Sequence, residues 1–309
     1  MKHLLLFSLF VLFTFVYVGC DSKSEDTVTP PVEQDKIVNT WISEGAGVAP
    51  GLVTTLKTVK IIATFNANNT YTVVAKDSAG SEVTYTGTYS VSENTGTTIR
   101  SITLNQSSPD TRTSQGIYQV DSKGMMKYEV VQTTPAIAGV TPPVPAEGFG
   151  STKYLGTPLG ATWIQGFVPS NPTSELLVGS WLSDGDNVAL GLKLVLKTKK
   201  IVATFNTNST YTVVATDSNN VDVTYSGTFS TSANSNTSIR NITVNQTLPT
   251  SLTSTGIYRV TTKDLKYEVL VTTPPTVGYT PPTAAEGFGS TKYNGVPLGI
   301  LWVQIFIAQ

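Results

Sequence analysis

The chain of 309 residues contains one domain-sized segment twice. Trp41-Ile42-Ser43 recurs 140 residues later as Trp181-Leu182-Ser183. Segments 41–123 and 181–263 are identical at 48 of 83 positions. Repeats of solenoid proteins are roughly 20–50 residues long, whereas a period of this length is typical of whole domains. The duplication therefore predicts two tandem domains, at 38–168 and 176–309, joined by a Pro-bearing linker at 169–175.

Each copy reads as a series of β-strands. Val83, Tyr85, Gly87 and Tyr89 alternate with Thr and Ser, which is the period of two expected for a half-buried antiparallel strand. Segment 66–69, Asn-Ala-Asn-Asn, is typical of a hairpin turn. About eight strands are expected in the first copy, around Trp41 and at 60–65, 70–75, 83–91, 99–106, 116–121, 126–133 and 162–168. The fold class is therefore all-β, either a closed up-and-down barrel or a sandwich.

The side-chain inventory argues against most catalytic chemistry. His3 and Cys20 are the single histidine and cysteine of the sequence, so the chain beyond residue 20 has neither. The usual zinc, haem and iron–sulfur ligands, disulfides, thiol nucleophiles and histidine triads are excluded there. Acids such as Glu129 and Glu147 form no recognisable catalytic pair. We therefore expect a protein that is not an enzyme and uses no cofactor or metal. Its 20 basic and 21 acidic residues also argue against nucleic acid as a partner.

The first twenty residues indicate export. Lys2 and His3 precede an apolar run from Leu4 to Val18, and fifteen helical residues rise only about 22 Å, short of the ~30 Å membrane core. This predicts a signal peptide at 1–19. Tyr17-Val18-Gly19-Cys20 resembles the lipobox of bacterial lipoproteins. That resemblance implies that Cys20 is acylated, with chains such as palmitate. The segment that follows is acidic, contains Pro30 and Pro31 and has no apolar period, which predicts a flexible tether at 20–37. The lipobox resemblance also implies lipid anchoring in the cell envelope, in the outer membrane, with the periplasmic and surface faces both open. The acidic residues after Cys20 resemble surface-export signals of lipoproteins, but Asp21 also resembles a signal for inner-membrane retention.

Three short motifs resemble those of lipocalins. Gly179-Ser180-Trp181 is similar to the Gly-x-Trp start of the family, and segments 65–71 and 85–89 are similar to hairpins of bacterial lipocalin-like lipoproteins. The resemblance implies two tandem, lipocalin-like, roughly eight-stranded barrels. The first copy lacks the glycine before Trp41, and no C-terminal helix is apparent.

The inward phase of the expected strands is rich in tyrosine. These side chains could line a barrel cavity for an apolar or aromatic ligand, or they could fill the barrel completely, because eight strands enclose little more space than side chains need. The candidate ligand-binding residues on the strands are Tyr71, Tyr85, Tyr118, Tyr128, Tyr211, Tyr225, Tyr258 and Tyr267.

A long segment precedes the last strand of each copy. Segment 134–160 exceeds the usual loop length, and such loops are often lids or binding loops. Its Gly-Phe-Gly-Ser-Thr run is a weak signal for a phosphate cradle and fits better a loop that covers one barrel mouth. It contributes the candidate ligand-binding residues Phe149, Tyr154, Phe288 and Tyr293. Asp77 and Glu82 could hold Ca²⁺ loosely, but a solvated turn fits their spacing better.

Two functions remain open from the sequence. The first is a membrane-anchored binding module for a small apolar or glycan ligand. The alternative is a structural or interaction lipoprotein, with filled barrels that present loops to a partner protein or envelope polymer. A tyrosine-lined cavity of ~300 Å³ or more would favour the first.

Overall fold

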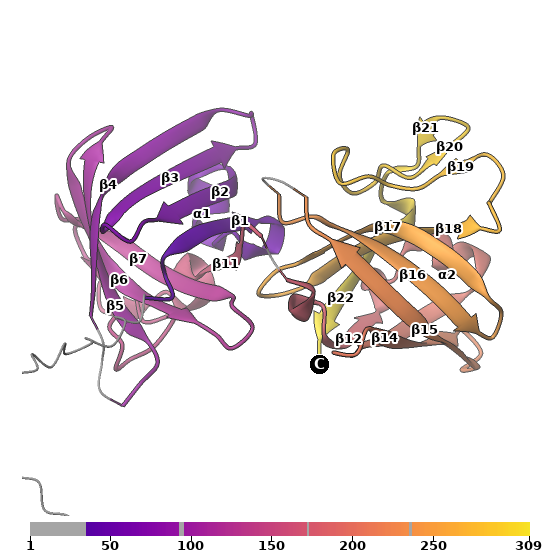
Figure 1. Cartoon of the computed structure of the whole chain (residues 1–309). Coiled ribbons are helices and arrows are strands. Elements are labelled where there is room, and N and C mark those ends of the chain that lie inside the picture. The colour runs from indigo at the N-terminus through magenta and orange to yellow at the C-terminus, as the bar shows by residue number, and fades with distance from the viewer. Residues whose placement is uncertain (1–34, 93–95, 172, 235–236) are drawn as a thin grey trace, which may run out of the picture. The chain divides into compact units, whose positions relative to one another are not determined.

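The computed structural model describes residues 35–92, 96–171, 173–234 and 237–309 (Figure 1). The expected signal peptide, Cys20 and most of the expected tether lie outside this part of the chain. The described residues form two closed, eight-stranded antiparallel barrels in tandem. The all-β fold class and the barrel rather than the sandwich are thereby confirmed.

The first barrel is an up-and-down meander. Each strand pairs with the next along the chain, and the last strand pairs with the first, Trp41 lying opposite Pro169. The strands are β1 (Asn39–Glu44), β2 (Thr58–Phe65), β3 (Thr70–Asp77), β4 (Glu82–Ser92), β5 (Arg100–Ser108), β6 (Arg112–Val120), β7 (Met126–Thr134) and β11 (Gln165–Pro169). Closure leaves no long exposed sheet edge in the barrel.

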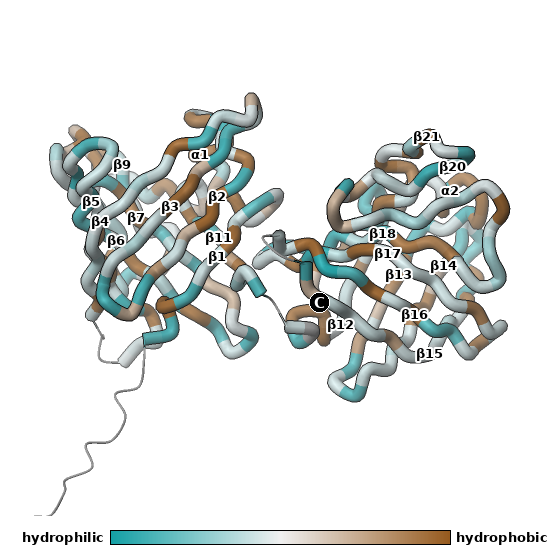
Figure 2. The backbone as a smooth tube through the Cα atoms, turned by 45° about the horizontal axis from the view of Figure 1, so that its top comes forward, coloured by the Kyte–Doolittle hydropathy of each residue, from teal (hydrophilic) through white to brown (hydrophobic). Residues whose placement is uncertain are grey.

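The second barrel repeats this order. Its strands are β12 (Gly179–Asp184), β13 (Thr198–Phe205), β14 (Thr210–Asp217), β15 (Asp222–Ser232), β16 (Arg240–Leu248), β17 (Leu252–Val260), β18 (Leu265–Thr273) and β22 (Gln304–Ala308). Apolar and polar segments both occur along the strands of each barrel in Figure 2, as expected when one face of a strand points inward and the other outward.

Short elements connect the barrel strands. A 3-10 turn and a short helix link the first two strands: η1 (Gly45–Gly47) and α1 (Pro50–Leu56), then η4 (Gly185–Asn187) and α2 (Leu190–Val195). The long segments form three-stranded sheets, β8 (Val140–Thr141), β9 (Lys153–Tyr154) and β10 (Thr157–Pro158), then β19 (Tyr279–Thr280), β20 (Lys292–Tyr293) and β21 (Val296–Pro297). Three further 3-10 turns are η2 (Gly160–Trp163), η3 (Ser174–Leu176) and η5 (Gly299–Trp302).

The last strand of the first barrel begins later than expected. The sequence pattern predicted a strand at 162–168, but Trp163 lies in η2, and β11 starts at Gln165. The Ile164 N–H bonds the Ala161 carbonyl, and Gly160 has a positive φ of 58°. An apolar run alone does not distinguish such a turn from a strand.

The turns between strands use the side chains that the sequence indicated. Asn69 adopts a positive φ of 62° in the β2–β3 turn, a conformation that Asn tolerates well. Asp77 Oδ1 accepts hydrogen bonds from the N–H groups of Ala79 and Ser81 at 2.9 and 2.8 Å. That carboxylate therefore organises its own turn, which accounts for the acid there without a cation.

One end of each barrel is filled. In the first barrel Trp41 is buried and its indole N–H donates to the Ile37 carbonyl at 2.7 Å. The Tyr118 hydroxyl donates to the Asp35 carboxylate at 2.8 Å, and Arg100 forms an ion pair with the same carboxylate. Asp35 and Ile37 fall within the expected tether, yet they pack onto the barrel. In the second barrel Trp181 donates to Leu177 in the same way, at 2.8 Å.

Candidate functional site

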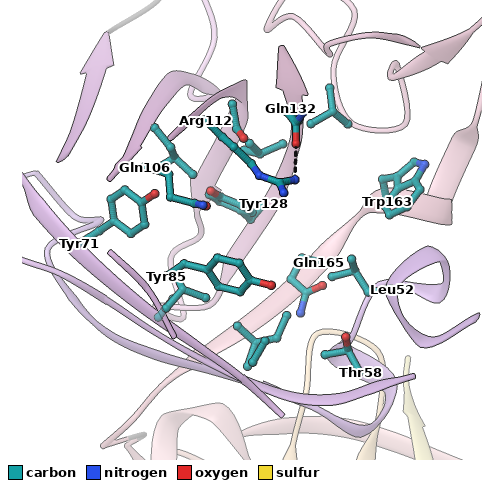
Figure 3. A pocket seen from close by; sticks show the side chains of 18 of the residues that line it. Leu52, Thr58, Tyr71, Tyr85, Gln106, Arg112, Tyr128, Gln132, Trp163 and Gln165 are labelled. Carbon is teal, nitrogen blue, oxygen red and sulfur yellow. Dashed lines mark hydrogen bonds between the residues drawn. The ribbon is translucent and has the colours of Figure 1, made fainter. Parts of the chain in front are cut away.

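The opposite end of the first barrel is hollow. A cavity of about 510 Å³ lies between the strands, and Figure 3 shows the side chains that point into it. The described residues that line it are Leu52, Leu56, Thr58, Ile61, Ala63, Phe65, Tyr71, Val73, Ala75, Tyr85, Leu104, Gln106, Arg112, Ser114, Tyr128, Val130, Val131, Gln132, Ile137, Val140, Trp163, Gln165 and Phe167. The barrel-strand residues among them come from the inward phase, apart from Val131 on β7 and Thr58 on β2. Thr58 lies at a register shift of β2.

The inner part of the cavity is apolar and aromatic. Phe65 packs edge-on against Tyr89, with ring centroids 5.1 Å apart, and Tyr128 packs edge-on against Phe167 at 5.9 Å. Such edge-to-face pairs are a favourable arrangement of aromatic rings. Small side chains of Ala63 and Ala75 on β2 and β3 leave the space beside these rings open. The arrangement suits the apolar body of a small molecule.

Buried tyrosines give this lining a few polar atoms. Burial raises the pKa of Tyr71 to about 12, and burial also raises the pKa of Tyr128. Both hydroxyls therefore stay protonated near neutral pH and can orient a ligand through hydrogen bonds, but they are poor bases. Tyr85 points across the cavity toward Gln165 in Figure 3.

Gln165 fixes the segment that forms one side of the mouth. Its carbonyl oxygen accepts from the Ala49 N–H at 2.9 Å, and its amide donates to Ser43 Oγ at 2.5 Å. Ala49 is the residue before α1, so this buried amide holds the start of that helix against β1 and β11. The helix then places Leu52 and Leu56 on the cavity.

The mouth reaches the molecular surface through apolar side chains. Leu56 on α1 and Ile137 on the long segment both line the cavity, and 59% and 48% of their surfaces are exposed. Trp163 packs over Gly51, where an added Cβ would lie 3.0 Å from the indole ring. An apolar cavity with an apolar, solvent-accessible rim lets a ligand enter without opening the barrel.

A polar cluster lies on the other side of the mouth. Arg112 Nε donates to Asp110 Oδ1 at 2.7 Å, and Nη2 donates to Oδ2 at 2.5 Å. Arg112 Nη1 donates to the side-chain oxygen Oε1 of Gln132 at 2.7 Å, as drawn in Figure 3. The hydrogen bonds from Arg112 lower the pKa of Asp110, so this carboxylate is ionised at neutral pH. We call Asp110, Arg112 and Gln132 the mouth cluster.

The second barrel contains a related but smaller cavity of about 320 Å³. Its described lining residues are Leu192, Leu196, Thr198, Ile201, Ala203, Phe205, Tyr211, Val213, Ala215, Tyr225, Gln246, Leu252, Ser254, Tyr267, Val269, Val271, Trp302, Gln304 and Phe306. Burial raises the pKa of Tyr211 to about 12 and also raises that of Tyr267. Gln304 accepts from the Ala189 N–H at 2.9 Å, as Gln165 does for Ala49.

The structure divides the twelve candidate ligand-binding residues into three groups. Six line the two cavities: Tyr71, Tyr85 and Tyr128, then Tyr211, Tyr225 and Tyr267. Tyr118 and Tyr258 are buried at the filled ends, where Tyr258 accepts from Arg240 Nε at 2.9 Å. The third group lies on the long segments, outside both linings: Phe149, Tyr154, Phe288 and Tyr293. In that group Tyr293 packs on Tyr279 at 4.9 Å, and Lys266 Nζ lies 5.0 Å from the Phe288 ring centre.

The Gly-Phe-Gly-Ser-Thr run binds a carboxylate of its own chain. Glu129 on β7 is fully buried and accepts hydrogen bonds from the Gly150 N–H at 2.6 Å and from the N–H and hydroxyl of Thr152. Glu268 is bound in the same way by Gly289 and Thr291. These backbone donors are thus engaged internally, which is a structural role for the run rather than a phosphate site.

Several cavity residues were not identified from the sequence. Arg112 and Gln132 lack any motif, and the α1 and η2 residues Leu52, Leu56 and Trp163 belong to elements that were not expected there. Glu129 occupies an outward position between inward Tyr128 and Val130, and its presence in both copies was no signal of burial, because the duplication retains many residues, the exposed Glu147 among them.

Within the described ranges, no helix is long and apolar enough to cross a membrane. No group of three or more metal-ligating side chains occurs among the same residues. No protein-family model and no curated protein matches this chain.

Proposed function

We propose that the protein is a lipid-anchored lipoprotein of the cell envelope that binds small apolar ligands in its barrels and catalyses no reaction. The anchor is supported by the lipobox-like segment that ends at Cys20. The observation that carries the binding function is the apolar, aromatic cavity of about 510 Å³ in the first barrel. This volume lies within the range of about 300–1,000 Å³ that is usual for ligand pockets.

The lining favours an apolar ligand over a glycan. Sugars are typically held by many hydrogen bonds, whereas most of the lining consists of aliphatic and aromatic side chains. The polar atoms are few, and they sit where they can fix the orientation of a ligand. Among the described lining residues there is no carboxylate, histidine or cysteine, which supports binding without catalysis.

Native mass spectrometry of the protein purified from its own cells tests this proposal. We expect an added mass that is released by organic solvent, and the stripped protein should then bind the neutral apolar dye N-phenyl-naphthylamine with increased fluorescence. Filling the cavities with Ala75→Trp and Ala215→Trp should abolish dye binding, because both alanines are lining residues. Ala79→Trp, at an exposed turn, is the control and should leave binding unchanged.

The alternative function, a structural or interaction lipoprotein, predicts the opposite result. If no mass is retained and the stripped protein binds no dye, the cavities have no ligand role. The loops around the barrels would then be the surfaces to test for a partner.

A further inference from the structure

The two cavities have nearly the same lining, and the positions that line both cavities differ in one chemical respect. Four residues line the first cavity only: Leu104, Val131, Ile137 and Val140. Each of the 19 residues that line the second cavity has a counterpart in the first lining, and 17 of these pairs are identical. The two exceptions are Arg112, replaced by Leu252, and Gln132, replaced by Val271.

The two exceptions form a bonded pair in the first barrel. Arg112 donates to Gln132, and its other hydrogen bonds go to Asp110, whose counterpart is Thr250. The whole mouth cluster is therefore polar in one barrel, while two of its three counterparts are apolar in the other. A change that covers bonded neighbours together removes a polar function without leaving one polar side chain beside an apolar replacement of its partner.

The turn that carries the mouth cluster is the same in both barrels. Gln106 donates to the carbonyl of Asp110 at 2.8 Å, and Gln246 donates to the carbonyl of Thr250 at 2.8 Å. The strands that follow, β6 and β17, each span nine residues and pair in the same register with the preceding strand. Since the backbone frame is shared, the difference lies in the side chains at the mouth.

Arg112 lines the cavity and has N–H groups beyond those that its cluster uses. A guanidinium has five N–H groups, and the bonds to Asp110 and Gln132 use three of them. Its side chain is 46% exposed, so a ligand at the mouth can reach it. An oxygen atom of a ligand would receive charge-assisted hydrogen bonds there. Beside Leu252 and Val271 the same oxygen would lose its water without gaining a partner, which is unfavourable.

We infer that the two barrels take different ligands, an inference that rests on the proposed binding function. The first barrel binds an amphiphile whose apolar body fills the cavity and whose oxygen-bearing head group lies at Arg112. The second barrel, with the smaller cavity, binds an apolar molecule that has no such head group.

Two dyes with the same apolar body test the inference. N-phenyl-naphthylamine is neutral, and anilinonaphthalene sulfonate adds an oxygen-bearing head group. Each barrel is measured in the full chain with the other cavity filled by Ala75→Trp or Ala215→Trp. We expect the first barrel to prefer the sulfonate dye by at least about tenfold relative to the second, as hydrogen bonds to a charged group imply.

Exchange of the mouth residues should move this preference. Arg112→Leu with Gln132→Val should weaken sulfonate binding to the first barrel about tenfold and leave neutral-dye binding within about threefold. The reverse exchange should give the second barrel the preference for the sulfonate dye. It combines Thr250→Asp, Leu252→Arg and Val271→Gln. Lys76→Ala removes a positive charge outside the lining and should change neither dye.

The outcomes separate the two proposals. The deciding quantity is the ratio of the affinities for the sulfonate dye and the neutral dye. If this ratio is equal in the two barrels, or does not respond to the exchange, this inference is overturned while the proposed apolar binding stands. Failure of both dyes to bind either barrel overturns the proposed function itself. Retained neutral-dye binding shows in every variant that the barrel is folded.

Discussion

At the scale of single residues, Glu129 and Glu268 are the buried carboxylates of the two barrels, and each requires hydrogen-bond donors around it. Each carboxylate is completely buried and is surrounded by three donors from the long segment of its own barrel. A buried charge is tolerated only when such donors satisfy it. Each glutamate therefore holds the long segment of its own barrel against the barrel wall. In the first barrel that segment carries Ile137, which lines the mouth of the cavity.

Replacement of this carboxylate by an amide should be costly. In Glu129→Gln one acceptor oxygen becomes an NH₂ group that faces donors, so at least one buried N–H loses its partner. We expect the free energy of unfolding to fall by about 2–3 kcal/mol, as for the loss of a buried hydrogen bond to a charged group. Urea denaturation followed by tryptophan fluorescence measures this change.

Glu147→Gln is the matched control for that substitution. Glu147 lies on the same long segment and pairs with Lys153 at 2.8 Å, but its side chain is exposed. Exposed pairs contribute little, so we expect a change below about 1 kcal/mol. Equal losses in the two variants would contradict the anchoring role of Glu129.

The cavity tyrosines predict how stability depends on high pH. An unfolded tyrosine ionises near pH 10, whereas burial raises the pKa of Tyr71 and Tyr211 to about 12. The folded chain therefore keeps protons that the unfolded chain loses, and stability that is complete below pH 10 should fall as the pH rises from 10 to 12. In Tyr71→Phe the loss of stability between pH 10 and pH 12 should be smaller. Ultraviolet titration that showed Tyr71 ionising near pH 10 would refute the burial.

The sequence identified the inward face of the strands but could not locate residues along the barrel axis. Period-two alternation places Tyr71, Tyr118 and Tyr128 on one face, which is why all three became candidates. Whether a given tyrosine lies at the filled or the hollow end depends on the length of each hairpin and on what closes the barrel. Tyr118 lies at the filled end because Asp35 and Arg100 meet it there.

At the scale of elements, the backbones of β6 and β7 leave no room for a side chain at Gly116. A Cβ added to Gly116 would lie 2.0 Å from the Glu129 carbonyl oxygen and 2.7 Å from the Val130 Cα. Both atoms belong to the backbone and cannot rotate away. The same crowding recurs at Gly256, with 2.1 Å to the Glu268 carbonyl oxygen. The wall that carries the buried glutamate therefore depends on this glycine.

Gly116→Ala should separate the two strands locally. We expect the barrel to lose about 2–3 kcal/mol, in the range seen when extra atoms are forced into a packed site. Chemical denaturation gives the value, and Gln115→Ala on the exposed face of the same strand serves as control, with an expected loss near 0.5 kcal/mol. A Gly116→Ala barrel as stable as the control would show that the strands can move apart freely.

The long strands could be predicted from the sequence, whereas the short helix and the 3-10 turns could not. Strands of eight or nine residues with alternating patterns, such as β2, β3 and β7, were located to within a few residues. The helix α1 has seven residues and η2 has four, too few for a helical period to stand out. Both lie at the cavity mouth, so the part of the site that sequence periodicity describes least is its entrance.

At the scale of the whole molecule, the duplication and the strand count predicted two all-β domains but left barrel and sandwich open. Closure rests on pairs such as Trp41 with Pro169, which are separated by most of a domain and carry no local pattern. The cavity was equally out of reach of the sequence. It depends on how far Trp41, Tyr118 and Met126 fill one end of the barrel, and residue type alone does not specify that volume.

The proposed location of the molecule depends on Cys20, and its replacement is the last prediction. In wild-type cells we expect the processed protein to sediment with membranes, because each buried CH₂ contributes about 0.8 kcal/mol and two or three acyl chains hold almost permanently. Cys20→Ser removes the only thiol of the chain, so acylation and the lipoprotein-specific cleavage before it should both stop. The variant should carry no labelled palmitate and should stay in the soluble fraction or keep its signal peptide. Neutral-dye binding by the variant separates loss of the anchor from loss of folding, since the described barrels begin beyond residue 34. Unchanged processing and sedimentation in a folded Cys20→Ser protein would rule out the lipid anchor and leave the binding function of the barrels to stand on the cavities alone.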